Sequence, residues 1–170
     1  NTVPKYSVNV DSIMNYIGFD KVLLNNRIVK LNKGMYLDFN AIAKGYCVDL
    51  LSKVLKENNI KNHLIEIGGE MYASGTNNIT NTSWKVGISD PLKPDYTKQK
   101  LFLKNSALAS SGNYRKFLID PETGDKIVHT INPNTGSADE TNILASSVIA
   151  ENCMTADAYA TAFMAMPLEK

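Results

Sequence analysis

The sequence predicts an α+β fold, because short strands outnumber helices and hairpins recur. Two stretches, 41–57 and 155–166, are rich in helix formers. Most of the remaining chain alternates short apolar segments with turns rich in Gly, Pro, Asn and Asp, a pattern typical of hairpins. We therefore expect mixed or antiparallel sheets with packed helices. No internal repeat or domain boundary is visible, so residues 1–170 are expected to form a single domain.

The composition is typical of a soluble globular domain. The chain has 170 residues, of which 44% are hydrophobic and 21% charged, which is enough for one domain with a hydrophobic core. A formal net charge of +1 gives no electrostatic reason to expect nucleic acid as a partner. No apolar run approaches the ~18 residues of a transmembrane helix. The chain starts without Met, and we interpret it as a piece of a longer protein, trimmed at both ends.

The chain has two cysteines and two histidines, which form no Cys/His zinc pattern. Cys47 and Cys153 are expected to be buried free thiols rather than a disulfide, because isolated cysteines usually pack as small apolar groups. His63 belongs to no recognised motif and is interpreted as structural.

Short elements are expected before the first long helix. Residues 12–18 predict a short helix. Short strands follow, at 22–24, 28–31 and 35–38. The long helix at 41–57 has Asn40 as its expected N-cap. Its apolar residues recur at three- and four-residue steps and predict one buried face, made of Cys47, Leu50, Leu51, Val54 and Leu55.

Strands and turns dominate the rest of the chain. Gly68 and Gly69 permit a tight strand exit or a close approach to a ligand. The turn at 120–124 separates two segments that predict a hairpin. The last helix, 155–166, has Thr155 as a candidate cap. The expected strands are 63–67, 71–74, 84–88, 101–103, 107–109, 114–119, 126–131 and 145–150.

Asp157 and Thr161 stand four residues apart in the last helix. That spacing puts a carboxylate and a hydroxyl on one face, one turn apart. Two hard oxygen ligands suit Mg²⁺, which takes few protein ligands and leaves room for substrate phosphates. The alternative is a solvated helix face, because polar pairs with this spacing are common on exposed helices.

Asp38 closes a predicted strand, and a small-residue turn then leads into a helix with an early Lys44. Helix N-termini with a nearby Lys attract phosphate. The alternatives are that Asp38 caps this helix and that Lys44 simply faces solvent. Together with Asp157 and Thr161, this segment indicates a protein that handles a phosphorylated ligand through a metal.

Six segments carry a more specific pattern. They are Asp38-Phe-Asn-Ala-Ile-Ala-Lys-Gly-Tyr-Cys-Val-Asp49, Ile67-Gly-Gly-Glu70, Trp84-Lys-Val-Gly-Ile-Ser-Asp-Pro91, Ala109-Ser-Ser-Gly-Asn-Tyr114, His129-Thr-Ile-Asn-Pro-Asn-Thr-Gly136 and Ala156-Asp-Ala-Tyr-Ala-Thr161. In this order they resemble the sequence blocks of the ApbE family, the FAD:protein FMN transferases. The sequence departs from the family pattern where Asn40 and Ala41 replace glycines and where Glu70, Asn113 and Asn132 each replace Asp.

The resemblance implies an ApbE-like, T-fold-like domain and a reaction. The family transfers FMN from FAD to a Thr side chain of a target protein, requires Mg²⁺ and releases AMP. Its typical targets are subunits of sodium-pumping NADH:quinone reductase and of Rnf-type electron-transfer complexes. Its members are usually exported and lipid-anchored at the cell envelope, and they are longer than this chain.

The resemblance also assigns residues. It implies that Asp157, Thr161 and the backbone carbonyl of Ala41 bind the metal. His129 is the candidate general base, since a histidine imidazole suits removal of a proton from a Thr hydroxyl. Alternatives that do not depend on the family are a structural His129 and a polar turn at 110–112. The residues expected to contact the flavin nucleotide are Asp38, Lys44, Ser110, Ser111, Gly112, His129 and Ile131.

Two other functions use the same residues. A FAD pyrophosphatase would have the same metal and nucleotide site with water as the nucleophile, giving FMN and AMP. A non-catalytic flavin-binding module, or a chain that binds no flavin, is the rival of another class, and the replacements at Asn40, Asn113 and Asn132 favour it most.

Overall fold

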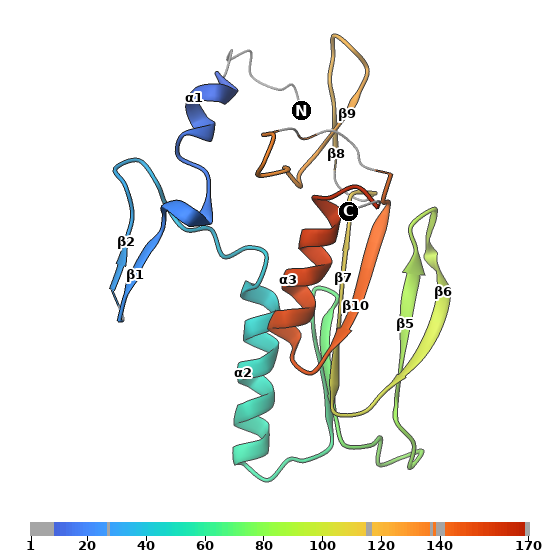
Figure 1. Cartoon of the computed structure of the whole chain (residues 1–170). Coiled ribbons are helices and arrows are strands. Elements are labelled where there is room, and N and C mark those ends of the chain that lie inside the picture. The colour runs from blue at the N-terminus through green and yellow to red at the C-terminus, as the bar shows by residue number, and fades with distance from the viewer. Residues whose placement is uncertain (1–8, 27, 115–116, 137, 139–141, 169–170) are drawn as a thin grey trace. The chain divides into compact units, whose positions relative to one another are not determined.

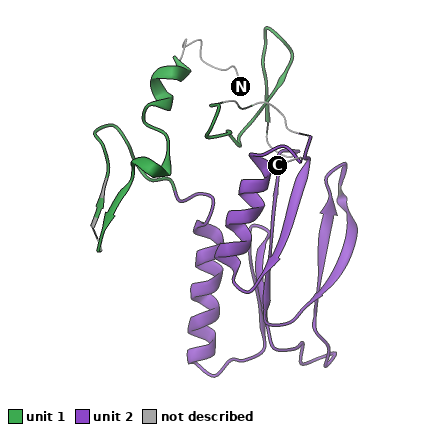
Figure 2. Cartoon of the chain, in the orientation of Figure 1, with its two compact units in different colours: residues 1–38, 116–140 green, residues 39–115, 141–170 purple. Residues whose placement is uncertain are grey.

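A computed structural model describes residues 9–26, 28–114, 117–136, 138 and 142–168. The chain divides into two compact units (Figure 2). Unit 1 comprises Asn1–Asp38 and Lys116–Glu140, and unit 2 comprises Phe39–Arg115 and Thr141–Lys170. None of the helices in the described part of the chain is long and apolar enough to cross a membrane.

Unit 1 consists of short elements (Figure 1), and neither its first helix nor its first strand contains a buried residue. Its helices are α1 (Val10–Met14), whose N-cap Asn9 accepts a hydrogen bond from the backbone N–H of Ser12, and the 3₁₀ helix η1 (Phe19–Lys21). Two antiparallel hairpins complete it, β1 (Leu23–Asn25) with β2 (Ile28–Lys30) and β8 (Phe117–Ile119) with β9 (Lys126–Val128). The predicted hairpin around 120–124 is therefore confirmed with shorter strands, whereas the strand predicted at 35–38 is wrong, because this segment pairs with no other strand.

Unit 2 is built on a four-stranded antiparallel sheet in the order β10-β7-β4-β3. The strands are β3 (His63–Ile67), β4 (Glu70–Ser74), β7 (Ser106–Gly112) and β10 (Ala145–Ala150). A long hairpin of β5 (Trp84–Asp90) and β6 (Lys93–Leu103) and two helices, α2 (Ala43–Glu57) and α3 (Cys153–Met164), complete the unit (Figure 1). The α+β class with antiparallel sheets and packed helices is thus confirmed.

Alternation along the central strands gives the sheet two buried faces. Successive side chains of a strand point to opposite faces. Tyr72 of β4 and its neighbour Ala107 of β7 pack against the helices. The next pair, Met71 and Leu108, packs against the hairpin. Unit 2 therefore has three layers, with α2 and α3 on one face of the sheet and β5–β6 on the other.

The helix layer lies close to the sheet because its contact residues are small. Ala107 and Ala109 of β7 face Ala156 and Ala160 of α3, and all four are fully buried. Gly45 of α2 is closer still to α3. A Cβ atom built on Gly45 would lie 2.4 Å from the carbonyl oxygen of Cys153, so no larger residue fits without moving a helix.

The start of α3 is joined to α2 through backbone amides. The carboxylate of Asp49 on α2 accepts hydrogen bonds from the N–H groups of Cys153 (2.8 Å) and Met154 (2.9 Å). Asn152 is the N-cap, and its side chain accepts from the N–H of Thr155 at 2.8 Å. The predicted cap at Thr155 is therefore wrong, since this residue is the donor in the capping interaction.

Two predictions about α2 are also wrong. The N-cap residue is Ile42, which makes no side-chain capping hydrogen bond, so the N-cap is not Asn40. Its buried residues are Gly45, Val48 and Ser52, whereas most of the predicted apolar face, including Leu50, Leu51 and Val54, is exposed. The predicted and the observed buried residues both recur at helical spacing. The observed ones are buried because α3 approaches α2 so closely that only smaller side chains fit between them.

Gly45→Ala is expected to destabilise the fold, although Ala is ordinarily the better helix residue by about 0.5–1 kcal/mol. The added methyl group overlaps the backbone of α3, and such overpacking typically costs about 1–3 kcal/mol. Urea unfolding of the variant measures the effect. Lys53→Ala is the matched control on the exposed side of α2, with an expected change within about 0.5 kcal/mol. A Gly45→Ala variant as stable as the wild type would contradict the close helix contact.

The two cysteines are free thiols, as predicted, but only Cys153 is buried, and Cys47 is exposed. Burial is the main reason that the pKa of Cys153 rises to about 12, and nearby Asp49 contributes. Because the thiolate is the reactive species, Cys153 is expected to be alkylated at least ~100-fold more slowly than Cys47 in the native protein. Peptide mass spectrometry during alkylation at pH 8 measures both rates, and urea should equalise them. Similar native rates would contradict the burial of Cys153.

Candidate functional site

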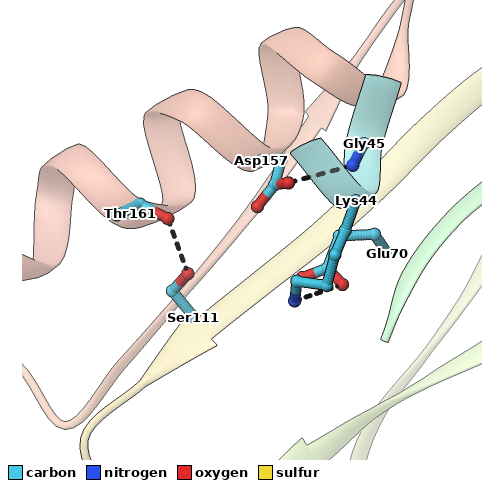
Figure 3. A network of polar contacts seen from close by, with 6 residues as sticks. All are labelled: Lys44, Gly45, Glu70, Ser111, Asp157 and Thr161. Atoms are coloured by element: carbon cyan, nitrogen blue, oxygen red, sulfur yellow. Dashed lines mark hydrogen bonds and ion pairs between the residues drawn. The ribbon is translucent and has the colours of Figure 1, made fainter. Parts of the chain in front are cut away.

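The candidate site lies in unit 2, where the first turn of α2, the β3–β4 turn, the end of β7 and one face of α3 meet. Figure 3 shows its polar contacts. Six residues form them: Lys44, Gly45, Glu70, Ser111, Asp157 and Thr161. The cluster combines two buried carboxylates, one ammonium, two hydroxyls and a backbone amide.

Asp157 is held by the helix contact described above. Its side chain is buried, with 2% of its surface exposed. Its Oδ2 accepts a hydrogen bond from the backbone N–H of Gly45 at 3.0 Å. Burial raises the pKa of Asp157, while this hydrogen bond and the charge of Lys44 oppose the rise. The alternative of a solvated helix face is therefore wrong for Asp157.

Thr161 lies one turn further along α3 and is half-buried. Its Oγ1 is 3.2 Å from Oγ of Ser111, so strand β7 orients the hydroxyl (Figure 3). Ser110 has a different environment, because neighbouring residues of a strand point to opposite faces. Its Oγ is 2.8 Å from Oγ of Ser147 on β10. Ser110, Ser111 and Gly112 belong to β7, so the alternative of a polar turn is wrong.

Lys44 and Glu70 form an ion pair, with Nζ and Oε2 2.5 Å apart. About half of the Lys44 side chain is exposed, at 48%, whereas Glu70 is only 1% exposed. The pKa of Glu70 is raised, mainly by burial; the ion pair with Lys44 opposes the rise, and the charge of Asp157 adds to it. Lys44 therefore contacts one buried carboxylate and stabilises the charge of a second.

Glu70 was not predicted as a site residue. The sequence signal that could have found it is an acidic residue directly after two glycines. Gly68 and Gly69 have positive φ values of 61° and 103°, as in the two-residue type I′ turn of hairpins. Ile67 and Glu70 are paired across this turn, so Glu70 begins a strand whose five residues are all buried. The tight strand exit predicted for the two glycines is confirmed.

The remaining predicted site residues are not among these six residues. Ala41 belongs to the turn that precedes α2. Asp38, His129 and Ile131 belong to unit 1, and their roles in binding or catalysis stay predictions. Gly112 is the last residue of β7, opposite Ala145.

The other histidine, His63, is buried in unit 2 and has two hydrogen-bond partners. Its Nδ1 is 3.0 Å from the carbonyl oxygen of Ile60, which only accepts, so Nδ1 carries the proton. Its Nε2 then accepts from Oγ of Ser52 at 2.9 Å. These contacts agree with the structural role interpreted from the sequence.

The donor atoms fit a hard divalent cation better than a soft one. Among the described residues, no three His, Cys, Asp or Glu side chains gather at one point. Asp157 and Thr161 offer a carboxylate and a hydroxyl, the ligand types that suit Mg²⁺. Because the carboxylate of Asp157 is buried, a bound cation would also offset its charge.

The sequence model of the ApbE family matches residues 2–170, nearly the whole chain. The chain belongs to the ApbE family. Among its relatives is a protein named FAD:protein FMN transferase from Haemophilus influenzae, which is 33% identical over 165 residues. The match covers 91% of this chain and 46% of that relative. A Vibrio cholerae protein of the same name is 33% identical over 137 residues, which are 80% of this chain and 40% of that relative.

Solved ApbE structures have the same fold. The flavin transferase ApbE from Vibrio cholerae matches 99% of this chain and 54% of its own, with a TM-score of 0.84 and 26% sequence identity. The ApbE protein from Thermotoga maritima matches 92% of this chain and 50% of its own, with a TM-score of 0.82 and 26% identity. The chain thus spans about half the length of the ApbE proteins it matches.

Proposed function

We propose that this protein transfers FMN from FAD to a threonine hydroxyl of a target protein, with Mg²⁺ as the metal and AMP as the released product. The observation that carries the proposal is the buried Asp157, oriented by the Gly45 amide and followed one turn later by Thr161. Membership of the ApbE family and relatives named FAD:protein FMN transferase support it.

The reaction is a phosphoryl-type transfer. The target hydroxyl attacks the FMN-side phosphorus, the bond from that phosphorus to the bridging oxygen breaks, and AMP leaves with the bridging oxygen. The hydroxyl proton passes to a general base, for which we propose His129. Bound Mg²⁺ would offset the charge that develops on the pyrophosphate.

The residues of the cluster would bind and orient. Asp157 and Thr161, with the carbonyl of Ala41, would hold the metal. Gly45 fixes the carboxylate and Ser111 fixes the hydroxyl. The exposed part of Lys44 would meet a phosphate. We further propose that the flavin nucleotide contacts the other predicted residues, Asp38, Ser110, Gly112 and Ile131.

The proposed targets are flavoprotein subunits of NADH:quinone reductase or Rnf-type complexes. Their modification would take place at the cell envelope, where we propose that the protein is lipid-anchored. Both points rest on the resemblance to the family, and a target assay tests the first directly.

Incubation of the complete protein with FAD, Mg²⁺ and a candidate target is expected to add one FMN to the target. Intact-protein mass spectrometry detects the addition, and a chelator should abolish it. A target whose acceptor Thr is replaced by Val is the control. Free FMN and AMP with an unmodified target would instead support a FAD pyrophosphatase. No turnover of FAD would support a flavin-binding module.

Asp157→Asn and Thr161→Val are expected to weaken Mg²⁺ binding and to lower the transfer rate on the order of 10²-fold or more, because a catalytic metal contributes several kcal/mol. Titration calorimetry measures the affinity and the mass assay measures the rate. Tyr159→Phe removes an exposed hydroxyl from the same helix and should change neither. Unchanged Mg²⁺ affinity in both site variants would refute the proposed metal ligands.

A further inference from the structure

Glu70 is a buried acid with an incomplete set of partners. Its Oε2 is paired with Lys44, whereas its Oε1 is buried and has no hydrogen-bond partner among the residues that the structure describes. Leaving a buried acceptor without a donor typically costs about 1–3 kcal/mol. A well-packed apolar residue often stabilises such a position as well as or better than a buried ion pair. Stability alone therefore does not explain a carboxylate here.

The two partners of this ion pair differ in how firmly they are held. Glu70 is fixed, because it follows a two-residue turn and belongs to a fully buried strand between β3 and β7. Lys44 is half-exposed and ends in an ammonium on a flexible four-carbon stem. The ion pair therefore restricts the position of the Lys44 ammonium, because the sheet holds Glu70 in place.

The ammonium has capacity for a second partner. Lysine has three N–H donors, and the structure assigns one of them to Oε2 of Glu70. Lys44 immediately precedes Gly45, whose amide binds Asp157. The pair thus lies beside the proposed metal ligand, where a nucleotide phosphate would bind.

We propose that Glu70 is a positioning residue: it holds the Lys44 ammonium beside Asp157, with its other donors directed to a phosphate of the bound nucleotide. The proposal rests on the proposed function. In this proposal, loss of the Glu70 charge weakens nucleotide binding because Lys44 is no longer held in place. It does not act by destabilising the fold.

Glu70→Gln tests this directly, because it keeps the shape and an acceptor oxygen but removes the charge. We expect kcat/KM for FAD to fall roughly 10- to 100-fold, mainly through KM, since a small misplacement of a binding group has effects of this size. Urea unfolding should show little change in stability, because the Lys44 ammonium that loses its charged partner is half-exposed and stays solvated. Glu57→Gln breaks an exposed pair with Lys53 on α2 and should change neither quantity.

A double-mutant cycle separates positioning from structure. If Glu70 acts through Lys44, Glu70→Gln should have little further effect in a Lys44→Met background. The proposal would be overturned if the two substitutions lowered kcat/KM independently, so that their effects multiplied in the double variant. An unchanged KM in Glu70→Gln would also overturn it. So would a loss of activity that follows a loss of stability.

Equilibrium binding of FAD, followed by flavin fluorescence, gives a readout that does not require transfer. Wild-type protein that binds FAD but transfers no FMN would overturn the proposed function alone, and weaker FAD binding by Glu70→Gln would still support the positioning role. Wild-type protein that binds no FAD would overturn both.

Discussion

The contact between α2 and α3 determines the geometry of the candidate site. Gly45 has no side chain, so the two helices approach until its amide reaches Asp157. A second tie lies close by, where Asp49 accepts from two amides at the start of α3. Because both ties join the same pair of helices, the position of Asp157 relative to Lys44 follows from helix packing and does not depend on a flexible loop.

The sheet contributes the other half of the cluster. Its inner strands are covered on both faces, which leaves little freedom to shift the register. Glu70 at the start of β4 and Ser111 near the end of β7 are therefore held as firmly as the core itself. Functional groups on rigid elements keep their geometry better than groups on loops. This arrangement buries two carboxylates, which is energetically unfavourable. The charge of Lys44 offsets only part of that cost.

Much of this arrangement can be predicted from local pattern. The tight strand exit at Gly68 and Gly69 and the one-turn separation of Asp157 and Thr161 follow from backbone freedom and helical spacing. The buried face of α2 does not, because Val48 and Leu51 both belong to sets with helical spacing and only tertiary packing distinguishes them. Glu70 was missed for a related reason, since its partner Lys44 is distant in sequence and no local pattern connects them. His129 is predicted only through the family resemblance. It belongs to the other unit, and its role stays a prediction.

The start of α3 has a chemical consequence for anion recognition. The first amides of a helix often bind phosphate, because they are unpaired and lie at the positive end of the helix dipole. Here the amides of Cys153 and Met154 bind Asp49, and those of Thr155 and Ala156 bind Asn152. An anion approaching this end meets a carboxylate in place of free donors. The helix dipole of α3 thus serves to join two helices, and these amides are not available to an external phosphate.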